Sequence, residues 1–181
     1  MGAGKTTVGR ELARRIGRTF IDCDQELEER LGVRVSTVFE IEGEAGFRVR
    51  ESRLLAELVQ RNDVVLATGG GMVVREENRA QLAQHCLVAY LRVPPRALWE
   101  RLRHDRTRPL LQVPNPRARI ETLFREREPL YCEVADVILD GGRGSAAQMA
   151  LRLEGMLAQF CEQHGEPAHM QGTEKRLQTN G

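Results

Sequence analysis

A glycine-rich segment at the beginning of the chain constrains the fold more than any other feature. The residues Gly2-Ala3-Gly4-Lys5-Thr6-Thr7 match the second half of the pattern G-x-x-x-x-G-K-[ST], whose first glycine would fall before Met1. A glycine turn that leads directly into a helix presents backbone N–H groups and the positive end of the helix dipole to an anion. In such a loop Lys5 reaches the β- and γ-phosphates of a nucleotide, and the Thr6 hydroxyl holds Mg²⁺. The segment therefore predicts a nucleotide site.

The distribution of lysine favours this prediction over the simpler alternative, a flexible glycine-rich terminus. Of the 27 lysines and arginines, only Lys5 and Lys175 are lysines. A phosphate-binding loop needs a compact ammonium on a flexible stem, and a broad guanidinium does not fit that role. The lysine at position 5 therefore indicates a side chain that binds phosphate.

The composition is typical of one soluble globular domain. The 181 residues are enough to bury a core, with 41% hydrophobic and 29% charged residues. The net charge of +1 gives no basic footprint for nucleic acid or a membrane, and no apolar run reaches the length of a membrane span. No signal peptide precedes the phosphate loop, so we expect a cytoplasmic protein. The cysteines lack C-x-x-C pairing and are expected to be reduced thiols: Cys23, Cys86, Cys132 and Cys161.

Helical and strand-like segments alternate along the chain. Hydrophobic periodicity predicts helices over 7–16, 25–31, 43–60, 78–83, 94–103, 117–131 and 145–164. Apolar runs predict strands over 19–22, 63–68, 86–91 and 135–139, and three prolines predict a loop over 106–116. Apolar strands that alternate with helices specify a three-layer α/β fold, a mostly parallel sheet covered on both faces. We expect one domain over 1–164 and a disordered polar tail over 165–181.

An acidic pair follows the first predicted strand, at an end where ligands gather in such sheets. Asp22 and Asp24 are two residues apart, so on an extended segment both carboxylates project to one side. One can face Mg²⁺ through water, while the other accepts a hydrogen bond from an attacking hydroxyl. The alternative is that both residues are N-caps of the next helix.

Three glycines and two arginines complete the candidate site. Gly69-Gly70-Gly71 follows another predicted strand. Three consecutive glycines lose much backbone entropy on folding, so such a run is expected where a ligand presses against the main chain. The alternative is a plain strand-to-helix turn. Arg48 and Arg127 lie near helix segments from which either guanidinium could clamp an acidic substrate, or could simply be solvated.

Taken together, these features resemble shikimate kinase. The matching segments occur in the family's order, with family-like spacing, over roughly residues 1–160. They are Gly2-Ala3-Gly4-Lys5-Thr6-Thr7, Asp22-Cys23-Asp24, Gly46-Phe47-Arg48 with Glu51, Gly69-Gly70-Gly71, Arg108-Pro109-Leu110-Leu111 and Arg127-Glu128-Pro129-Leu130-Tyr131. The resemblance implies a nucleoside monophosphate kinase-like fold of the P-loop type, with parallel strand order 2-3-1-4-5. It also implies transfer of the ATP γ-phosphate to the 3-hydroxyl of shikimate, in chorismate and aromatic amino acid biosynthesis.

On the substrate side, the resemblance implies that Asp24 binds the ring hydroxyls and orients or deprotonates the nucleophile. Arg48 and Arg127 would grip the shikimate carboxylate, and the backbone of Gly69, Gly70 and Gly71 would line the pocket. A small acid with adjacent hydroxyls requires such an arginine clamp at one end and a carboxylate at the other.

On the nucleotide side, the resemblance implies that Gly2, Ala3, Gly4, Lys5, Thr6 and Thr7 bind ATP. Thr6 would ligate Mg²⁺, and Asp22 would support the ion through water. Arg108 would meet the phosphates from a lid over about 104–117 that excludes water. Arg101 is a weaker candidate for the nucleotide side, and Arg143 would lie against the adenine.

Other functions stay open at this stage. A gluconate kinase-like enzyme would share the loop and the fold, although not the full set of acidic, arginine and glycine motifs. A nucleoside monophosphate kinase would need a base-reading pocket, which nothing in the sequence suggests. A nucleotide-binding module that has lost catalysis is a further alternative. For the family, a monomer that binds neither nucleic acid nor membrane is the default.

The first strand of this fold is central, and we expect it to be absent from this chain. Its absence would leave an open seam between two strand pairs, with unpaired backbone groups along both edges. The preferred explanation is a misplaced start codon, with about ten residues upstream. The sequence thus predicts a chain of low stability and weak activity, both recovered by an N-terminal extension.

Overall fold

A left-handed glycine starts the first helix. In the computed structural model, which describes residues 2–105, 108–141 and 144–165, Gly4 has φ 89° and directly precedes α1 (Lys5–Arg15). An L-residue rarely adopts this conformation, so glycine is favoured where the loop turns into the helix. The predicted positions Arg143, 106–107 of the lid and 166–181 of the tail lie outside the described residues.

Among the residues that the structure describes, four short strands form two parallel pairs. Strand β1 (Thr19–Asp22) pairs with β2 (Val64–Ala67), and β3 (Ala89–Arg92) pairs with β4 (Val137–Asp140). Within the described ranges the two pairs form separate sheets. The prediction of parallel strands is confirmed, and the pairs are those that the order 2-3-1-4-5 leaves when its central strand is taken out.

The helices agree with the sequence prediction, apart from their exact ends, except at three places: the start of α3 (Val35–Leu58) and the short turns η1 (Met72–Val74) and η2 (Pro109–Leu111), which the sequence did not predict. The remaining helical elements are α2 (Cys23–Leu31), α4 (Glu76–His85), α5 (Pro95–Leu102), α6 (Pro116–Val134) and α7 (Ala146–His164). Helix α3 begins at Val35 rather than at residue 43, because the chain is already helical before a kink at Gly43 (φ 69°, ψ −178°). The predicted loop over 106–116 contains the short turn η2.

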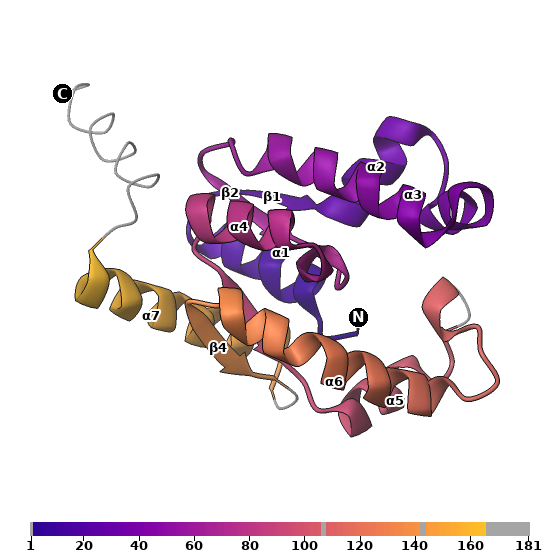
Figure 1. Cartoon of the computed structure of the whole chain (residues 1–181). Helices are drawn as coiled ribbons and strands as arrows, with labels where there is room; N and C mark the ends of the chain where they lie inside the picture. Colours follow the sequence, from indigo (N-terminus) through magenta and orange to yellow (C-terminus); the bar gives the residue numbers. More distant parts are fainter. Residues whose placement is uncertain (1, 106–107, 142–143, 166–181) are drawn as a thin grey trace.

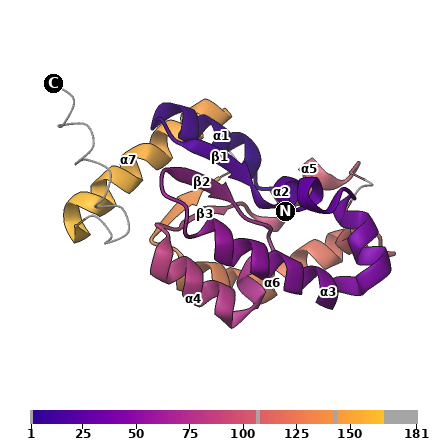
Figure 2. The ribbon, with the colours of Figure 1, turned by 90° about the horizontal axis from the view of Figure 1, so that it is seen from above.

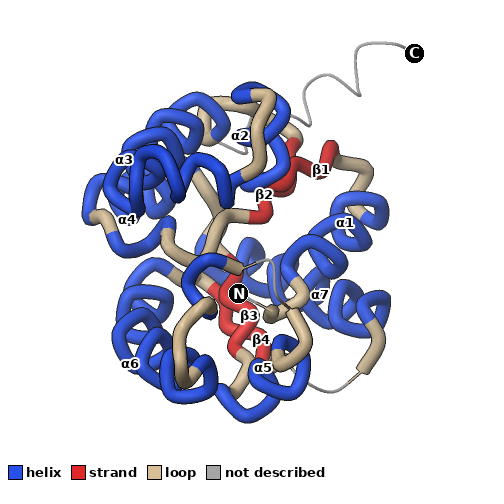
Figure 3. The backbone as a smooth tube through the Cα atoms, turned by 90° about the vertical axis from the view of Figure 1, so that its right-hand side faces the viewer, coloured by secondary structure: helices blue, strands red, loops and turns tan. Residues whose placement is uncertain are grey.

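The strands lie between two layers of helices. In Figures 2 and 3, α1 and α7 cover one side of the strands, and α3, α4 and α6 cover the other. One buried cluster joins β1 to α2, α3 and α4, with Leu55 and Leu58 fully buried. A second cluster joins α1 to β3, β4 and α7 (Figure 1). Among the described helices, none has the length and apolar character that a membrane crossing requires.

An apolar cavity of about 670 Å³ separates the two strand pairs. Its walls include the inner strands β2 and β3 and the α1 residues Val8 and Leu12. Its lining also includes Lys5, Gly70 and Arg127, so the cavity continues into the region of the predicted site. The seam expected between the strand pairs is therefore confirmed.

Candidate active site

The loop before α1 packs closely on helix α5. Gly2 has φ 67°, and a Cβ atom there would lie 2.9 Å from the Leu102 side chain. The Arg101 guanidinium donates a hydrogen bond to the Gly2 carbonyl at 3.2 Å. Helix α5 therefore holds the loop from one side, and it places Arg101 beside the predicted nucleotide site.

Asp22 connects the loop to the end of strand β1. The Thr6 hydroxyl donates to Asp22 Oδ2 at 2.7 Å, while Asp22 Oδ1 accepts from the Asp24 N–H at 3.1 Å. The N-cap interpretation is therefore confirmed for Asp22, which caps α2 while contacting Thr6. The prediction that both carboxylates project to one side of an extended segment is wrong for Asp24, because α2 begins at Cys23 and places Asp24 in its first turn. The two acids still interact electrostatically.

Lys5, Asp24 and Arg108 form an electrostatic group at this end of the sheet. Burial lowers the pKa of the Lys5 ammonium, and the charges of Asp24 and Asp22 oppose that shift. Burial raises the pKa of Asp24, the Asp22 charge adds to the effect, and Lys5 and Arg108 oppose it. These charges come from three separate segments of the chain. The structure therefore brings the predicted phosphate-binding lysine and the predicted base together.

Arg108 is held at the edge of this group by its own loop. Its Nε donates to Asp105 Oδ2 at 2.8 Å, and its charge acts on both Lys5 and Asp24. A guanidinium at this place can complement the negative charge of phosphate groups.

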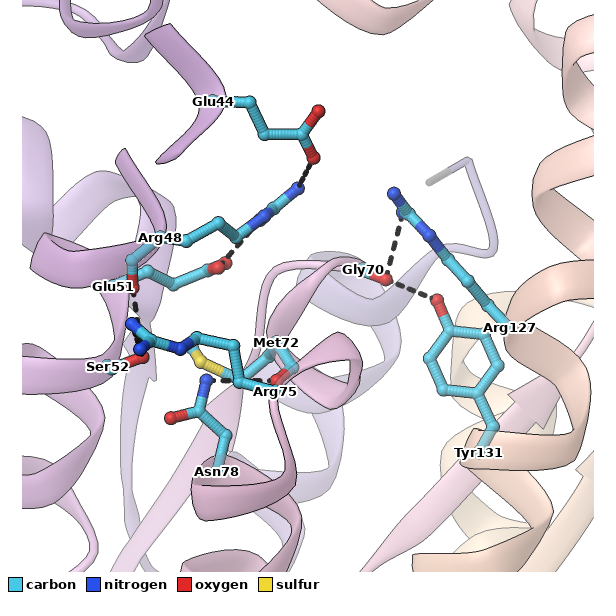
Figure 4. Close-up of polar contacts among 10 residues, drawn as sticks. All are labelled: Glu44, Arg48, Glu51, Ser52, Gly70, Met72, Arg75, Asn78, Arg127 and Tyr131. Carbon is cyan, nitrogen blue, oxygen red and sulfur yellow. Dashed lines mark hydrogen bonds and ion pairs between the residues drawn. The ribbon is translucent and has the colours of Figure 1, made fainter. Parts of the chain in front are cut away.

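Arg48 lies on α3 between two carboxylates (Figure 4). Its Nη1 donates to Glu51 Oε2 at 2.6 Å, and its Nη2 donates to Glu44 Oε1 at 2.9 Å. Glu51 is only 2% exposed, and burial raises its pKa while the Arg48 charge lowers it. Glu51 therefore fixes the guanidinium at the wall of the site.

The glycine turn after β2 passes directly over these side chains. A Cβ atom at Gly71 would overlap the Arg48 guanidinium, and one at Gly69 would overlap the Glu51 carboxylate. The same Cβ at Gly69 would lie 3.0 Å from Asp24 Oδ1. In the structure, protein side chains make a close approach to Gly69 and Gly71, and the predicted contact of a ligand with this backbone stays a prediction.

Arg127 reaches the same turn from α6. Its Nη1 donates to the Gly70 carbonyl at 3.1 Å, and the Tyr131 hydroxyl donates to the same oxygen at 2.5 Å. Arg127 is 9% exposed, as is Arg48. Figure 4 shows the two guanidinium groups on opposite sides of Gly70. The structure thus brings both predicted arginines to the turn.

Sequence reasoning assigned no contact to Glu44 or Tyr131, and it noted Glu51 only within a motif. Helical spacing could have found them. Glu44 and Glu51 lie four residues before and three residues after Arg48, and Tyr131 lies four residues after Arg127, so each pair shares a helix face.

The Thr6 hydroxyl and the Asp22 carboxylate, beside the phosphate loop, fit a hard divalent cation. The donor set predicted for Mg²⁺, the Thr6 hydroxyl and the Asp22 carboxylate, lies within 2.7 Å oxygen to oxygen. Magnesium prefers few protein oxygens and keeps much of its water, which suits such a sparse set. Among the described residues, no group of three or more His, Cys, Asp or Glu side chains forms a dedicated metal cage. Cys23 is buried and Cys132 is exposed, and neither forms a disulfide with another described residue.

Comparison with known proteins matches this geometry. The sequence profile of the family described as "SKI: Shikimate kinase" matches residues 1–158. A shikimate kinase of Aromatoleum aromaticum is 61% identical over 160 residues, covering 88% of this chain and 91% of that protein. The relative from Chromobacterium violaceum, also named shikimate kinase, is 60% identical and covers 77% of this chain and 76% of its own.

Solved structures give the same result. Shikimate kinase from Acinetobacter baumannii, solved in complex with shikimate, superposes with a TM-score of 0.86 at 44% identity, covering 88% of this chain and 89% of that one. The Bacteroides thetaiotaomicron shikimate kinase superposes with a TM-score of 0.80 at 34% identity, covering 87% and 94%. With the family profile and the close relatives in agreement over most of its length, the chain belongs to the shikimate kinase family.

Proposed function

We propose that this chain transfers the γ-phosphate of ATP to the 3-hydroxyl of shikimate. The observation that carries the proposal is the convergence of Arg48 and Arg127 on the Gly70 turn, beside Asp24 and Lys5. Two buried guanidinium groups suit a carboxylate, and an acid next to a phosphate-binding lysine suits a hydroxyl that attacks phosphate. The relative solved in complex with shikimate supports the same substrate.

Asp24 orients the attacking hydroxyl in this proposal. Its raised pKa makes the carboxylate a better proton acceptor than an ordinary aspartate. Phosphoryl transfer passes through a loose transition state, so correct placement of the hydroxyl matters more than its early deprotonation. Gly69 leaves room for Asp24 at the turn, because any side chain there would displace it. The Asp24 carboxylate and the two arginines then fix both ends of a small acidic ring.

Gly2, Ala3, Gly4 and Thr7 would surround the ATP phosphates with backbone N–H groups, and Lys5 would balance their charge. Thr6 and Asp22, already hydrogen-bonded to each other, would hold Mg²⁺, with Asp22 acting through water. The ion, when bound, neutralises charge on the β- and γ-phosphates.

Arg108 would contact the phosphates from the lid over about 104–117, and Arg143 would lie against the adenine. Closure of that lid would exclude water, which otherwise competes as the phosphoryl acceptor. We also propose a cytoplasmic monomer that binds neither nucleic acid nor membrane. The small net charge of +1 supports the last part, because it gives no basic footprint for either partner.

The substitution Arg127→Ala tests the substrate assignment. We expect the KM for shikimate to rise at least about 30-fold, the effect of removing a buried charged partner, and the KM for ATP to change little. Steady-state kinetics with each substrate varied in turn measure both values. The control is Arg117→Ala on the same helix, where the side chain is 64% exposed and pairs only with Glu121 among described residues. A selective loss of ATP affinity in Arg127→Ala would contradict the assigned role.

The acceptor itself is tested by a coupled assay of ADP release, first with shikimate and then with gluconate. Turnover with gluconate alone would replace the proposal with the alternative of another small-molecule kinase. ATP binding without turnover on either acid would favour an inactive nucleotide-binding module.

A further inference from the structure

Arg48 has both of its terminal nitrogens engaged by glutamates of its own helix. Glu51 takes Nη1 at 2.6 Å, and Glu44 takes Nη2 at 2.9 Å. Among the described residues, Arg48 Nε is buried without a hydrogen-bond partner. A carboxylate that binds a guanidinium well uses two parallel N–H donors. A substrate carboxylate that uses Nη2 therefore has to meet Glu44 first.

The two glutamates differ in how firmly they are held. The Glu51 side chain is 3% exposed, whereas the Glu44 side chain is 48% exposed. A buried partner of a charge cannot leave without stranding that charge, whereas an exposed ion pair is weak and exchanges with water. Glu51 therefore stays with Arg48, and Glu44 is the partner that a ligand can replace.

The backbone leaves Glu44 room to move aside. It directly follows Gly43, whose φ of 69° interrupts the helix, and its own side chain is 48% exposed to solvent. Figure 4 shows Glu44 reaching Arg48 from the side away from Glu51. The Glu44 side chain can therefore swing away while Arg48 stays on Glu51.

Building on the assignment of Arg48 to the shikimate carboxylate, we propose that Glu44 is an internal competitor for that carboxylate. Glu44 neutralises Arg48 in the free enzyme, and the substrate displaces it on binding. It sets the affinity for shikimate without taking part in phosphoryl transfer. Removing its charge therefore improves substrate binding, whereas removing a residue that merely supports the site would weaken it.

The test is Glu44→Gln, which keeps the shape of the side chain and removes its charge. We expect the Kd for shikimate, measured by titration calorimetry, and the KM for shikimate to fall about two- to fivefold, the range of an exposed ion pair. The kcat and the KM for ATP stay unchanged. The control is Glu42→Gln, which removes an equal charge from the same helix but pairs with Arg50 at 2.6 Å, and we expect it to leave the shikimate KM unchanged.

A second variant separates the inference from the function on which it rests. In an Arg48→Ala background, Glu44→Gln is expected to have no effect on the shikimate KM, because the contested donor is gone. An unchanged or higher KM in Glu44→Gln alone overturns the inference while leaving the function intact. Absence of shikimate phosphorylation by the unmodified chain, or a normal KM in Arg48→Ala, overturns the proposed function or the Arg48 assignment instead.

Discussion

At Gly71 the main chain passes so close to the Arg48 guanidinium that no side chain fits between them. Gly69 has the same relation to Glu51 and Asp24. The turn thus fixes the positions of three charged groups, those of Arg48, Glu51 and Asp24. Each lies close to the turn because the glycines carry no Cβ. The geometry of the charges depends on residues that themselves carry no charge.

The raised pKa of Asp24 predicts how the activity depends on pH. Its pKa is raised above the ordinary 3.8 by burial and by Asp22, and only the ionised form accepts the proton of the attacking hydroxyl. The kcat/KM for shikimate is therefore expected to fall as the pH falls through this raised pKa, with an acid limb above 3.8. A pH–rate profile measures the limb.

Substituting Asp24 tests whether its carboxylate causes the acid limb of the pH–rate profile. Asp24→Asn is expected to lower kcat at least about 100-fold while ATP binding remains. Asp140→Asn, at an exposed residue paired with Arg92, is expected to leave the limb in place. Ordinary turnover in Asp24→Asn would refute the role of the carboxylate.

Among the helices, α6 contacts the glycine turn directly through hydrogen bonds. Two of its side chains donate to the single carbonyl oxygen of Gly70, and Tyr131 also stacks on Tyr90 of β3, with ring centroids 4.9 Å apart. Helix α6 therefore connects the turn after β2 to the other strand pair. Gly70, Tyr90 and Tyr131 all line the cavity between the two strand pairs.

Tyr131→Phe tests this link. It removes one donor to Gly70, so we expect a loss of stability of about 1 kcal/mol and a shikimate KM about two- to tenfold higher. Chemical denaturation and steady-state kinetics measure the two effects. Tyr90→Phe keeps the stacked rings and is the matched control, with smaller effects on both. Equal behaviour of the two variants would mean that the hydroxyl does not position the turn.

Sequence reasoning predicted the elements well where pattern alone decides them. The strand over Thr19–Asp22 was placed correctly because its apolar residues lie between Gly17 and a helix cap. The start of α3 was missed, since Gly43 reads as a helix boundary but is accommodated as a kink. The contacts of Arg48 and Arg127 were not predicted, because a sequence motif identifies a residue but not the side chains that it contacts in the fold. Only packing decides that Glu51 becomes buried and Glu44 remains exposed.

In the molecule as a whole, the apolar cavity lies between the two strand pairs and interrupts the sheet. The inner edges of β2 and β3 face this cavity, and a sheet edge without a partner leaves backbone N–H and C=O groups unpaired. Ala3 also lines the cavity, so the phosphate loop begins at its wall. Any segment that fills the cavity should therefore change both the stability of the chain and the position of the phosphate loop.

Filling the cavity is expected to raise both the stability and the activity of the chain. A short apolar strand, added before Met1 and ending in a glycine turn, is expected to pair with both β2 and β3. We expect the Tm to rise by about 5 °C or more and turnover to increase. Calorimetry and the coupled assay compare the two chains, and an extension of equal length made of serine and glycine is the control. Equal Tm and equal turnover for the apolar extension and the original chain would contradict the prediction.

The packing of α1 on α7 has a consequence for synthesis. The first helix carries the phosphate loop, yet its apolar residues Val8 and Leu12 share a cluster with Met149 and Leu153 near the end of the chain, and Arg15 pairs with Glu154 at 2.6 Å. While the ribosome is still making the middle of the chain, α1 can pack on β1 and β2, where Gly9 lies against Phe20 and Val65, but it lacks the surface that α7 provides. We therefore expect nascent chains that stop short of α7 not to retain ATP, so the part translated first becomes functional last.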